Sequence, residues 1–312
     1  MPSPRARQIV VAGATGQRID NFLVRELRGI PKSRIYRMLR TGEVRVNGGR
    51  VRPSQRLEDG DRVRIPPLAG LREAGVQGGE EPFIGSELLE LLERSIIFED
   101  ASLIALDKPA GLPVHGGSGL SFGVIEALRR LRPDADLHLA HRLDRDTSGC
   151  LLIGKSRARL LELHRALRDR EVKKRYDVLV MGRWPRRTAT VQYPLLKYLL
   201  ASGERRVRVA DEGKPSRTDF SIRDTANHAT WLEARLHTGR THQIRVHAQA
   251  IGHPVVGDDK YASPEQLAYA RSRGIRRLCL HAAELVFMHE GGRLRISAPV
   301  PADFEAAWQA LD

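Results

Sequence analysis

Residues 141–149, HRLDRDTSG, concentrate charged side chains in a short segment between two apolar runs, LHLA and CLLIG. Each run is short and apolar enough to form a buried strand, so the segment is predicted to be a loop at the edge of a sheet. Loops on a rigid scaffold commonly carry catalytic groups. An Asx-type turn over residues 146–149, with its glycine at positive φ, explains the end of the segment. It does not explain why His141, Arg142 and Asp144 stand together before the turn.

Asp144 by itself admits two interpretations, because an aspartate in a polar loop can cap a turn or, when ionised, act as a nucleophile. Two other stretches also contain residue types suited to chemistry. In TGRTHQIRVH, over residues 238–247, Thr241 is predicted to be an N-cap, which places Arg245 about one turn into a helix. In KKRYDVLV, Tyr176 lies in a predicted strand, where a tyrosine is more often a core residue than a catalytic one.

These stretches resemble the motifs of one enzyme family. HRLDRDTSG matches the HRLDxxTSG signature of the RluA-type family of RNA pseudouridine synthases without departure, and RTHQIRVH and KKRYDVLV match two further motifs. The resemblance implies that Asp144 is the catalytic aspartate, that Arg245 pairs with it, and that Tyr176 stacks on the target base. It also implies that Arg142 fills the space that the target base leaves.

The chemistry implied by the resemblance suits these residue types. A cation beside a carboxylate favours the ionised form, which a nucleophile needs. A phenol ring can stack on any base, and its hydroxyl can exchange a proton. A structural salt bridge between Asp144 and Arg245 would leave the same local sequence, so only the joint match of the motifs favours a catalytic role.

Two more stretches are similar to the family, namely LDKPAGLPVHGGSGLSFGVIEALR, and GHPVVGDDKYA followed by LCLHAAELVFMH. At one position the sequence departs slightly from the family pattern. The family frequently ends its late motif with YG, whereas Tyr261 is here followed by Ala262, which concerns only a loop turn.

The positive charge of the chain is concentrated near its N-terminus. The net charge is +14, with a pI of about 10.4, which by itself fits a nucleic acid, an acidic membrane or a merely basic surface as partner. Residues 18–66 contain thirteen Lys or Arg against six Asp or Glu, about half of the net charge in about a sixth of the length. This distribution is typical of a nucleic-acid-binding module.

The same segment has the pattern of a small α+β unit. Apolar spacing predicts two helices, and alternation predicts two strands. The predicted elements are a helix over residues 19–27, a helix capped by Ser33 and ended by Gly42, and strands at 43–48 and 61–65 with Asn47-Gly48 as a hairpin turn.

The run KSRIYRMLRTGEVRVNGGRV resembles the S4 RNA-binding domain over nearly the whole length of the run. The resemblance makes the basic side chains of the second helix candidates for RNA binding. A solvated helix face is the alternative for its row of arginines. The candidates are Lys32, Arg34, Arg37 and Arg40.

Three parts are therefore predicted: an S4-like RNA-binding domain at residues 18–66, a linker rich in Gly, Pro and Glu at 67–85, and a catalytic domain at 86–312. In the last part, strands outnumber helices and often follow one another, which favours an α+β fold with a mixed, largely antiparallel sheet. The predicted helices are 86–94, 124–131 and one capped by Ser156, and the predicted strands are 95–98, 103–107, 176–180, 219–222, 231–236, 278–286 and 293–296.

Several classes of protein are disfavoured by the sequence. Cys150 and Cys279 are far apart and lack CxxC spacing, so we expect buried free thiols rather than a disulfide framework or a zinc site. The histidines show no HExxH arrangement, and there is no GxxxxGK[ST] phosphate loop. With neither a signal peptide nor a membrane-spanning run, we expect a cytoplasmic protein.

The resemblance implies isomerisation of uridine to pseudouridine in 23S ribosomal RNA or a precursor of the large subunit, by a monomer without cofactor, metal or membrane. Three routes remain open: Asp144 could attack C1′, attack the base, or abstract a ribose proton. Two other classes of function also remain. One is a non-catalytic RNA-binding or ribosome-assembly factor, and the other is a nuclease that uses Asp144 and Asp146 as paired carboxylates on Mg²⁺.

Overall fold

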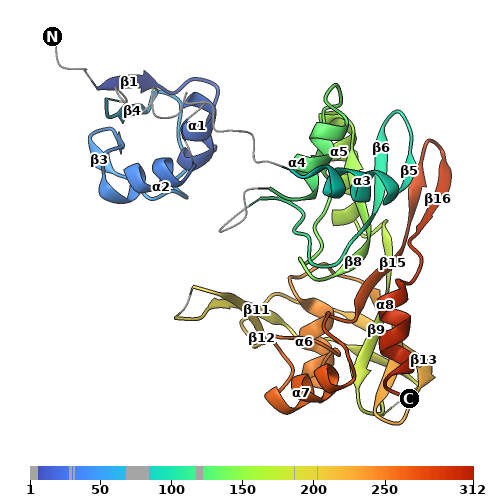
Figure 1. Cartoon of the computed structure of the whole chain (residues 1–312). Coiled ribbons are helices and arrows are strands. Elements are labelled where there is room, and N and C mark those ends of the chain that lie inside the picture. The colour runs from blue at the N-terminus through green and yellow to red at the C-terminus, as the bar shows by residue number, and fades with distance from the viewer. Residues whose placement is uncertain are drawn as a thin grey trace. The chain divides into compact units, whose positions relative to one another are not determined.

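The computed structural model describes residues 6–27, 30, 32–67, 84–116, 122–185, 187–201 and 203–312, except for the side chains of Lys32, Ser33 and Thr188. The chain forms two compact units, which divide between Phe83 and Ile84 (Figure 1). We call them the N-terminal unit and the C-terminal unit. Most of the predicted linker, residues 67–85, lies outside the described residues.

The N-terminal unit packs two helices against a small antiparallel sheet with strand order β1-β4-β2-β3. Its core contains the apolar faces of both helices, including Phe22, Leu23 and Met38. Asn47 and Gly48 both have positive φ, at 50° and 82°, so the predicted hairpin turn is confirmed. The elements are β1 (Arg7–Val10), α1 (Ile19–Glu26), α2 (Lys32–Thr41), β2 (Arg45–Val46), β3 (Gly49–Arg50) and β4 (Arg62–Ile65).

One predicted cap in this unit is wrong. Helix α2 begins at Lys32, so Ser33 is the second residue of the helix and not its N-cap. Its end is as predicted, because Gly42 follows with φ at +75°, a conformation that glycine adopts without strain. Strand β1 was not predicted.

The C-terminal unit is built on one ten-stranded sheet with strand order β10-β13-β14-β9-β15-β8-β6-β5, to which β16 and β7 add at β15 and β8. All of its strand pairs are antiparallel except β15 with β8. The α+β fold with a mixed, largely antiparallel sheet is thus confirmed. The strands are β5 (Ile96–Glu99), β6 (Leu103–Lys108), β7 (His138–Leu139), β8 (Ser148–Gly154), β9 (Lys173–Met181), β10 (Thr188–Val191), β13 (Thr218–Thr225), β14 (Ala229–Leu236), β15 (Leu280–His289) and β16 (Gly292–Ser297).

Both faces of the sheet are covered, which explains the uninterrupted apolar run of β8. Leu151 and Ile153 pack in one core cluster with α3, α4 and α6, whereas Cys150 and Leu152 pack in another with α5. Both cysteines are buried and free as predicted, and burial raises the pKa of each thiol to about 12. The helices are α3 (Ser86–Arg94), α4 (Val124–Leu131), α5 (Arg157–Arg168), α6 (Gln243–Ala250), α7 (Pro264–Ser272) and α8 (Ala302–Gln309).

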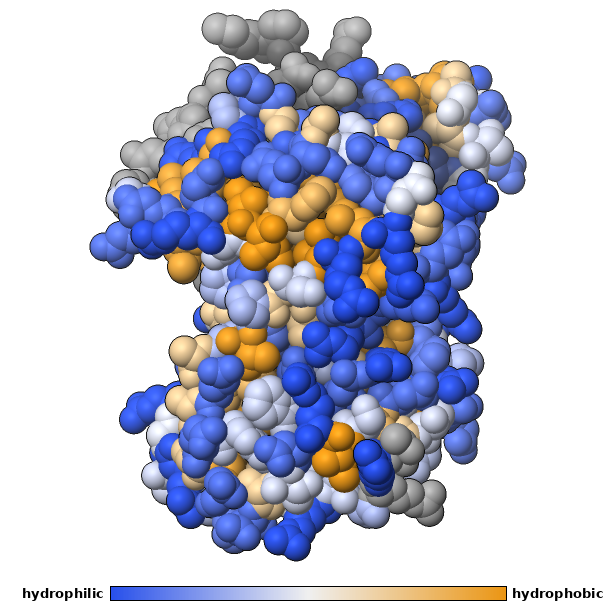
Figure 2. Space-filling model, turned by 90° about the vertical axis from the view of Figure 1, so that its right-hand side faces the viewer, coloured by the Kyte–Doolittle hydropathy of each residue, from blue (hydrophilic) through white to orange (hydrophobic). Residues whose placement is uncertain are grey.

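The predicted cap of α5 is confirmed, since Ser156 Oγ accepts the N–H of Arg159 at 3.1 Å. Helices α7 and α8, strand β10 and a separate two-stranded hairpin were not predicted. The hairpin consists of β11 (Leu195–Leu199) and β12 (Arg205–Val209). No helix among the described residues is long and apolar enough to cross a membrane, and the face shown in Figure 2 is mainly hydrophilic, with hydrophobic residues gathered in patches.

Candidate active site

A cleft of about 1020 Å³ opens on the C-terminal unit; two of the three predicted catalytic residues line it, and the third contacts one of them. Asp144 lines the cleft from the loop between β7 and β8, and Tyr176 lines it from β9. Arg245, on α6, is buried and does not line the cleft, but its guanidinium contacts Asp144. The sheet and one helix therefore bring together residues that are up to 101 positions apart in the chain.

The loop that carries Asp144 is closed by a turn, because the Thr147 N–H donates to the Asp144 carbonyl at 3.2 Å. Beneath it, the buried ammonium of Lys108 donates to the carbonyls of Pro109, Leu112 and Arg145 at 2.7–2.9 Å. Burial lowers the pKa of Lys108 to about 7. The turn therefore lies about two residues earlier than the predicted Asx-type turn over 146–149, whose last two residues already belong to β8.

Gly149 confirms the predicted positive φ, at +105°. Its role is a close approach between strands, since a Cβ atom there would lie 2.3 Å from the carbonyl oxygen of Ala282 on β15. Beside it, Ser148 Oγ lies 2.9 Å from His281 Nδ1 and accepts from Arg277 at 2.6 Å. The end of the HRLDRDTSG segment thus fixes β8 to β15 and holds the loop that carries Asp144.

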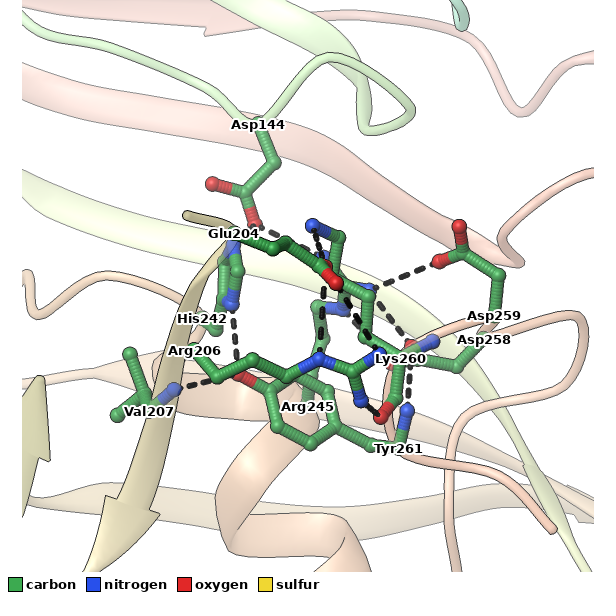
Figure 3. Close-up of polar contacts among 10 residues, drawn as sticks. All are labelled: Asp144, Glu204, Arg206, Val207, His242, Arg245, Asp258, Asp259, Lys260 and Tyr261. Carbon is green, nitrogen blue, oxygen red and sulfur yellow. Dashed lines mark hydrogen bonds and ion pairs between the residues drawn. The ribbon is translucent and has the colours of Figure 1, made fainter. Parts of the chain in front are cut away.

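Arg245 does contact Asp144, but its principal partner is another carboxylate. Its Nη1 lies 3.5 Å from Asp144 Oδ2, whereas Nε and Nη2 donate to the two oxygens of Asp258 at 2.7 and 2.6 Å. Although burial alone would lower the pKa of Arg245, the hydrogen bonds to Asp258 and the charges of Asp258 and Asp144 raise it above its ordinary value. The bidentate pair holds the guanidinium so that one edge faces Asp144 (Figure 3).

Asp258 is a site residue that sequence reasoning missed. It is fully buried, and its Oδ1 also accepts the N–H groups of Lys260 and Tyr261 at 2.9 and 3.1 Å. The ring of Tyr261 lies under the guanidinium of Arg245, with its centroid 5.2 Å away. The stretch GDDKYA could have pointed to Asp258, because it matches the family, but the match assigned no role to its residues.

His242 is the second missed residue. Its Nε2 lies 3.7 Å from Asp144 Oδ2, and its Nδ1 lies 2.7 Å from the hydroxyl of Tyr261, which accepts the N–H of Val207. Because Nδ1 is the sole acceptor near this hydroxyl hydrogen among the described residues, we assign the hydrogen to it, which leaves a proton on Nε2 facing Asp144. Burial lowers the pKa of His242, so the imidazole is neutral at pH 7.

The predicted N-cap of α6 is wrong. The helix begins at Gln243, and the residue before it, His242, has φ at +53°. The preceding loop is closed instead by the buried side chain of Gln243, whose Oε1 accepts from the Thr238 hydroxyl and the Arg240 N–H at 2.7 and 3.0 Å. Thr241 therefore has no capping role in this helix.

Tyr176 and His141 remain neutral for related reasons. Burial, followed by the charge of Asp144, raises the pKa of the largely buried Tyr176, so its hydroxyl stays protonated. Burial lowers the pKa of His141 to about 4, and its Nε2 accepts the N–H of Leu152 at 3.1 Å. We infer that His141 positions the loop, while Tyr176 is the aromatic surface of the cleft.

The rim of the cleft is strongly basic. Arg142 is exposed next to Asp144 on the same loop, and the other basic lining side chains come from the end of α5 and the turn after it, from β9, β14 and β16, and from the segment before α6. Such a rim attracts a polyanion. These residues are Arg168, Arg170, Lys173, Lys174, Arg175, Arg235, Arg240, Arg293 and Arg295.

Besides Arg142, the predicted RNA-binding residues lie in the N-terminal unit and differ from one another. Arg34 is tied to Glu43 by two hydrogen bonds of 3.1 and 2.7 Å. Arg37 and Arg40 are exposed on α2. The side chain of Lys32 lies outside the described part of the structure.

The paired-carboxylate alternative receives no added support from the geometry. Within the described ranges, one group of three His, Cys, Asp or Glu side chains is close enough to share an ion: Asp100, His289 and Glu290. It includes neither Asp144 nor Asp146, and His289 Nε2 already lies 2.6 Å from Asp100.

Comparisons with known proteins match both units. The model of the RNA pseudouridylate synthase family matches residues 102–250, and that of the S4 domain matches residues 17–63. Ribosomal large subunit pseudouridine synthase C of Pasteurella multocida is 51% identical over 95% of this chain and 90% of the relative. Its counterpart in Escherichia coli K12 is 50% identical over 97% of this chain and 95% of the relative.

Solved structures show the same fold. Human RNA pseudouridylate synthase domain containing 4 has a TM-score of 0.61 at 24% identity, covering 72% of this chain and 95% of the human chain. Human RNA pseudouridylate synthase domain containing 1 has a TM-score of 0.58 at 25% identity, covering 70% and 86%.

Proposed function

The chain belongs to the RNA pseudouridylate synthase family, and from this premise we propose that it converts uridines of 23S ribosomal RNA to pseudouridine with Asp144 as the catalytic aspartate. Relatives named as large-subunit synthases match the chain over nearly their whole length, which supports this substrate. One observation carries the catalytic assignment: Asp144 faces a basic cleft while its Oδ2 lies 3.5 Å from a buried arginine.

The target uridine has to leave the RNA stack before its glycosidic bond can be reached. Tyr176 supplies an aromatic surface inside the cleft on which the uracil stacks. Arg142 is exposed on the same loop as Asp144, where its side chain takes the place of the extruded base. The other basic side chains of the rim hold the neighbouring phosphates.

The reaction rearranges bonds within one nucleotide. The C1′–N1 bond breaks, the uracil rotates while it is held, and C5 joins C1′. N1 then gains a proton and C5 loses one, so substrate and product are isomers and the balance needs no cofactor.

Asp144 enters this sequence as an ionised carboxylate. Attack on C1′, attack on the base and abstraction of a ribose proton all need that form. The guanidinium of Arg245 and the Nε2–H of His242 both face Asp144 Oδ2 and stabilise its charge. Asp258 and Tyr261 hold Arg245 in place, so they act through it.

The N-terminal unit holds the ribosomal RNA. Exposed Arg37 and Arg40 on α2 are suited to phosphate contacts, whereas Arg34 is tied to Glu43. We assign RNA binding to residues 18–66, the link to 67–85 and catalysis to 86–312. The substrate places the enzyme in the cytoplasm, where it acts as a monomer on the large subunit or its precursor.

Carbodiimide-based mapping of pseudouridine in 23S rRNA tests the proposal. A strain without this protein should lack pseudouridine at specific positions, and the purified enzyme should restore it on the unmodified RNA in the presence of EDTA. Unchanged modification in that strain would contradict the rRNA substrate. Restoration that requires Mg²⁺ and cuts the RNA would favour the nuclease instead.

A further inference from the structure

The hairpin of β11 and β12 stands apart from the ten-stranded sheet and exposes an unusual set of side chains. Figure 1 shows it projecting from the C-terminal unit beside α6. Tyr198, Leu199 and Val209 are 37%, 65% and 38% exposed. Lys197 and Arg205 are exposed too, and neither has an acidic partner among the described residues. The reaction described above assigns no role to these side chains.

The strand register divides the hairpin into two faces, because residues directly opposite in an antiparallel pair point to the same side. Lys197 pairs with Val207, and Leu199 pairs with Arg205, so these four share one face. Tyr198 and Arg208 lie on the other face, where the Arg208 guanidinium is 5.8 Å from the centre of the tyrosine ring.

The first of these faces begins next to the active site, because Val207, which belongs to it, donates its N–H to the hydroxyl of Tyr261, the partner of His242. At its base, Leu195 and Val207 pack against Val246 of α6, the helix that carries Arg245. Farther out, the pKa of Lys197 is lowered by partial burial and by the positive charges of Arg142, Lys214, Arg205 and Arg240. Since Arg142 and Arg240 line the cleft, this face continues the basic rim. We call it the cleft face.

The base of the hairpin is fixed to the segment 258–261, which holds Arg245 in place. The N–H of Val207 donates to the hydroxyl of Tyr261 at 3.0 Å, and Arg206 donates to the carbonyl of Lys260. Lys260 Nζ in turn lies 2.5 Å from Glu204 (Figure 3). The hairpin therefore holds a defined position relative to Asp144, as a surface that guides a strand into the cleft must do.

We propose that the cleft face is an RNA-binding arm, in which Lys197 and Arg205 bind phosphates of the strand next to the target uridine and Leu199 packs against its sugars or bases. The inference rests on the proposed function, because it requires an RNA substrate. Unopposed cations beside an apolar side chain suit single-stranded RNA, which offers phosphates and unstacked bases together.

Two charge reversals on the same strand test this arm in the full-length protein. Arg205→Glu changes the cleft face, and Arg208→Glu makes the same change three residues away on the opposite face. Both side chains are exposed, so both variants should fold. Affinity for a protein-free 23S rRNA fragment is measured at several salt concentrations, together with single-turnover rates at saturating RNA.

Arg205→Glu should weaken binding about tenfold and flatten the log–log salt dependence by about 0.7 for the lost phosphate contact. Arg208→Glu should change affinity less than about threefold, and Lys197→Glu should behave like Arg205→Glu. Equal effects of Arg205→Glu and Arg208→Glu would overturn the proposal, because they would reflect net charge alone.

Normal binding by Arg205→Glu to free RNA, with loss of modification only on ribosomal particles, would also overturn it and point to a protein partner. The wild-type enzyme separates this inference from its premise. If the wild type binds the fragment but forms no pseudouridine, the proposed function fails. If the wild type forms pseudouridine and Arg205→Glu binds and reacts normally, the proposed RNA-binding role of the hairpin is wrong but the proposed function stands.

Discussion

The active site of the C-terminal unit and helix α2 of the N-terminal unit use arginine in opposite ways. In the C-terminal unit, Arg245 is 3% exposed and is held by the fully buried Asp258. In the N-terminal unit, Arg37 and Arg40 are exposed to solvent. A buried ion pair has a fixed geometry, and removal of one partner leaves the other as an uncompensated buried charge. Exposed cations each add to the attraction for a polyanion, and salt screens that attraction. The first arrangement suits catalysis and the second suits RNA affinity.

The largest effect that this comparison predicts is at Asp258. Asp258→Asn leaves the buried guanidinium of Arg245 without its principal charge partner, which should lower the free energy of unfolding by about 3 kcal/mol. Turnover should fall by more than about 100-fold, because Arg245 loses its position beside Asp144. Urea unfolding and tritium release from RNA labelled at uracil C5 measure the two effects.

Asp259→Asn is the matched control, since Asp259 adjoins Asp258 and lies 3.5 Å from Arg245 but is 66% exposed. It should stay close to wild type in both measurements. Similar losses in both variants would refute the distinction between buried and exposed charges.

Arg245→Lys should have the next largest effect. A single ammonium cannot bind both oxygens of Asp258 and still face Asp144, so turnover should fall by about 30- to 100-fold while RNA affinity changes little. Arg271→Lys, at an exposed position on α7 away from the lining of the cleft, is the control. Unchanged single-turnover kinetics in Arg245→Lys would show that the contact with Asp144 is unnecessary.

His242 should have a smaller effect, since its Nε2 lies 3.7 Å from Asp144 in this structure. Loss of one donor to a carboxylate predicts a decrease in turnover of about tenfold for His242→Ala. His242→Gln, whose amide can again place an N–H near Asp144, should recover part of it. If both variants react as fast as the wild type, the imidazole plays no part in stabilising Asp144.

Removal of the N-terminal unit should have the smallest effect on chemistry. The units have separate cores, and Asp144, Tyr176 and Arg245 all belong to the C-terminal one. Deletion of the residues before about residue 82 should weaken rRNA binding. It should also reduce the slope of log affinity against log salt concentration by about one for each lost phosphate contact. Single-turnover rates at saturating RNA should largely survive. A folded truncation without turnover would make the N-terminal unit part of the catalytic assembly.

Local features of this fold could be predicted from the sequence, because neighbouring residues determine them. The Asn47-Gly48 turn, the Ser156 cap and the strands around HRLDRDTSG are examples. The predicted N-cap at Thr241 was wrong because the side chain of Gln243 closes that loop, through contacts that depend on the burial of Gln243. Local patterns do not encode such burial.

Contacts between distant segments could not be predicted. The pair of Asp258 and Arg245 spans 13 residues, and the bond from Val207 to Tyr261 spans 54. Strands β11 and β12 mix charged and apolar residues without alternation on a buried face, so they gave no strand signal. The motifs identified Asp144 and Arg245, but only the three-dimensional structure identifies the residues that hold them.

The most direct test of the account is tritium release by Asp144→Ala and Asp144→Asn from 23S rRNA labelled at uracil C5, with RNA affinity measured in parallel. Neither variant should release tritium above background, while both should bind the RNA within about threefold of the wild type, because phosphate contacts dominate affinity. Clear residual turnover by either variant would contradict the central role of Asp144.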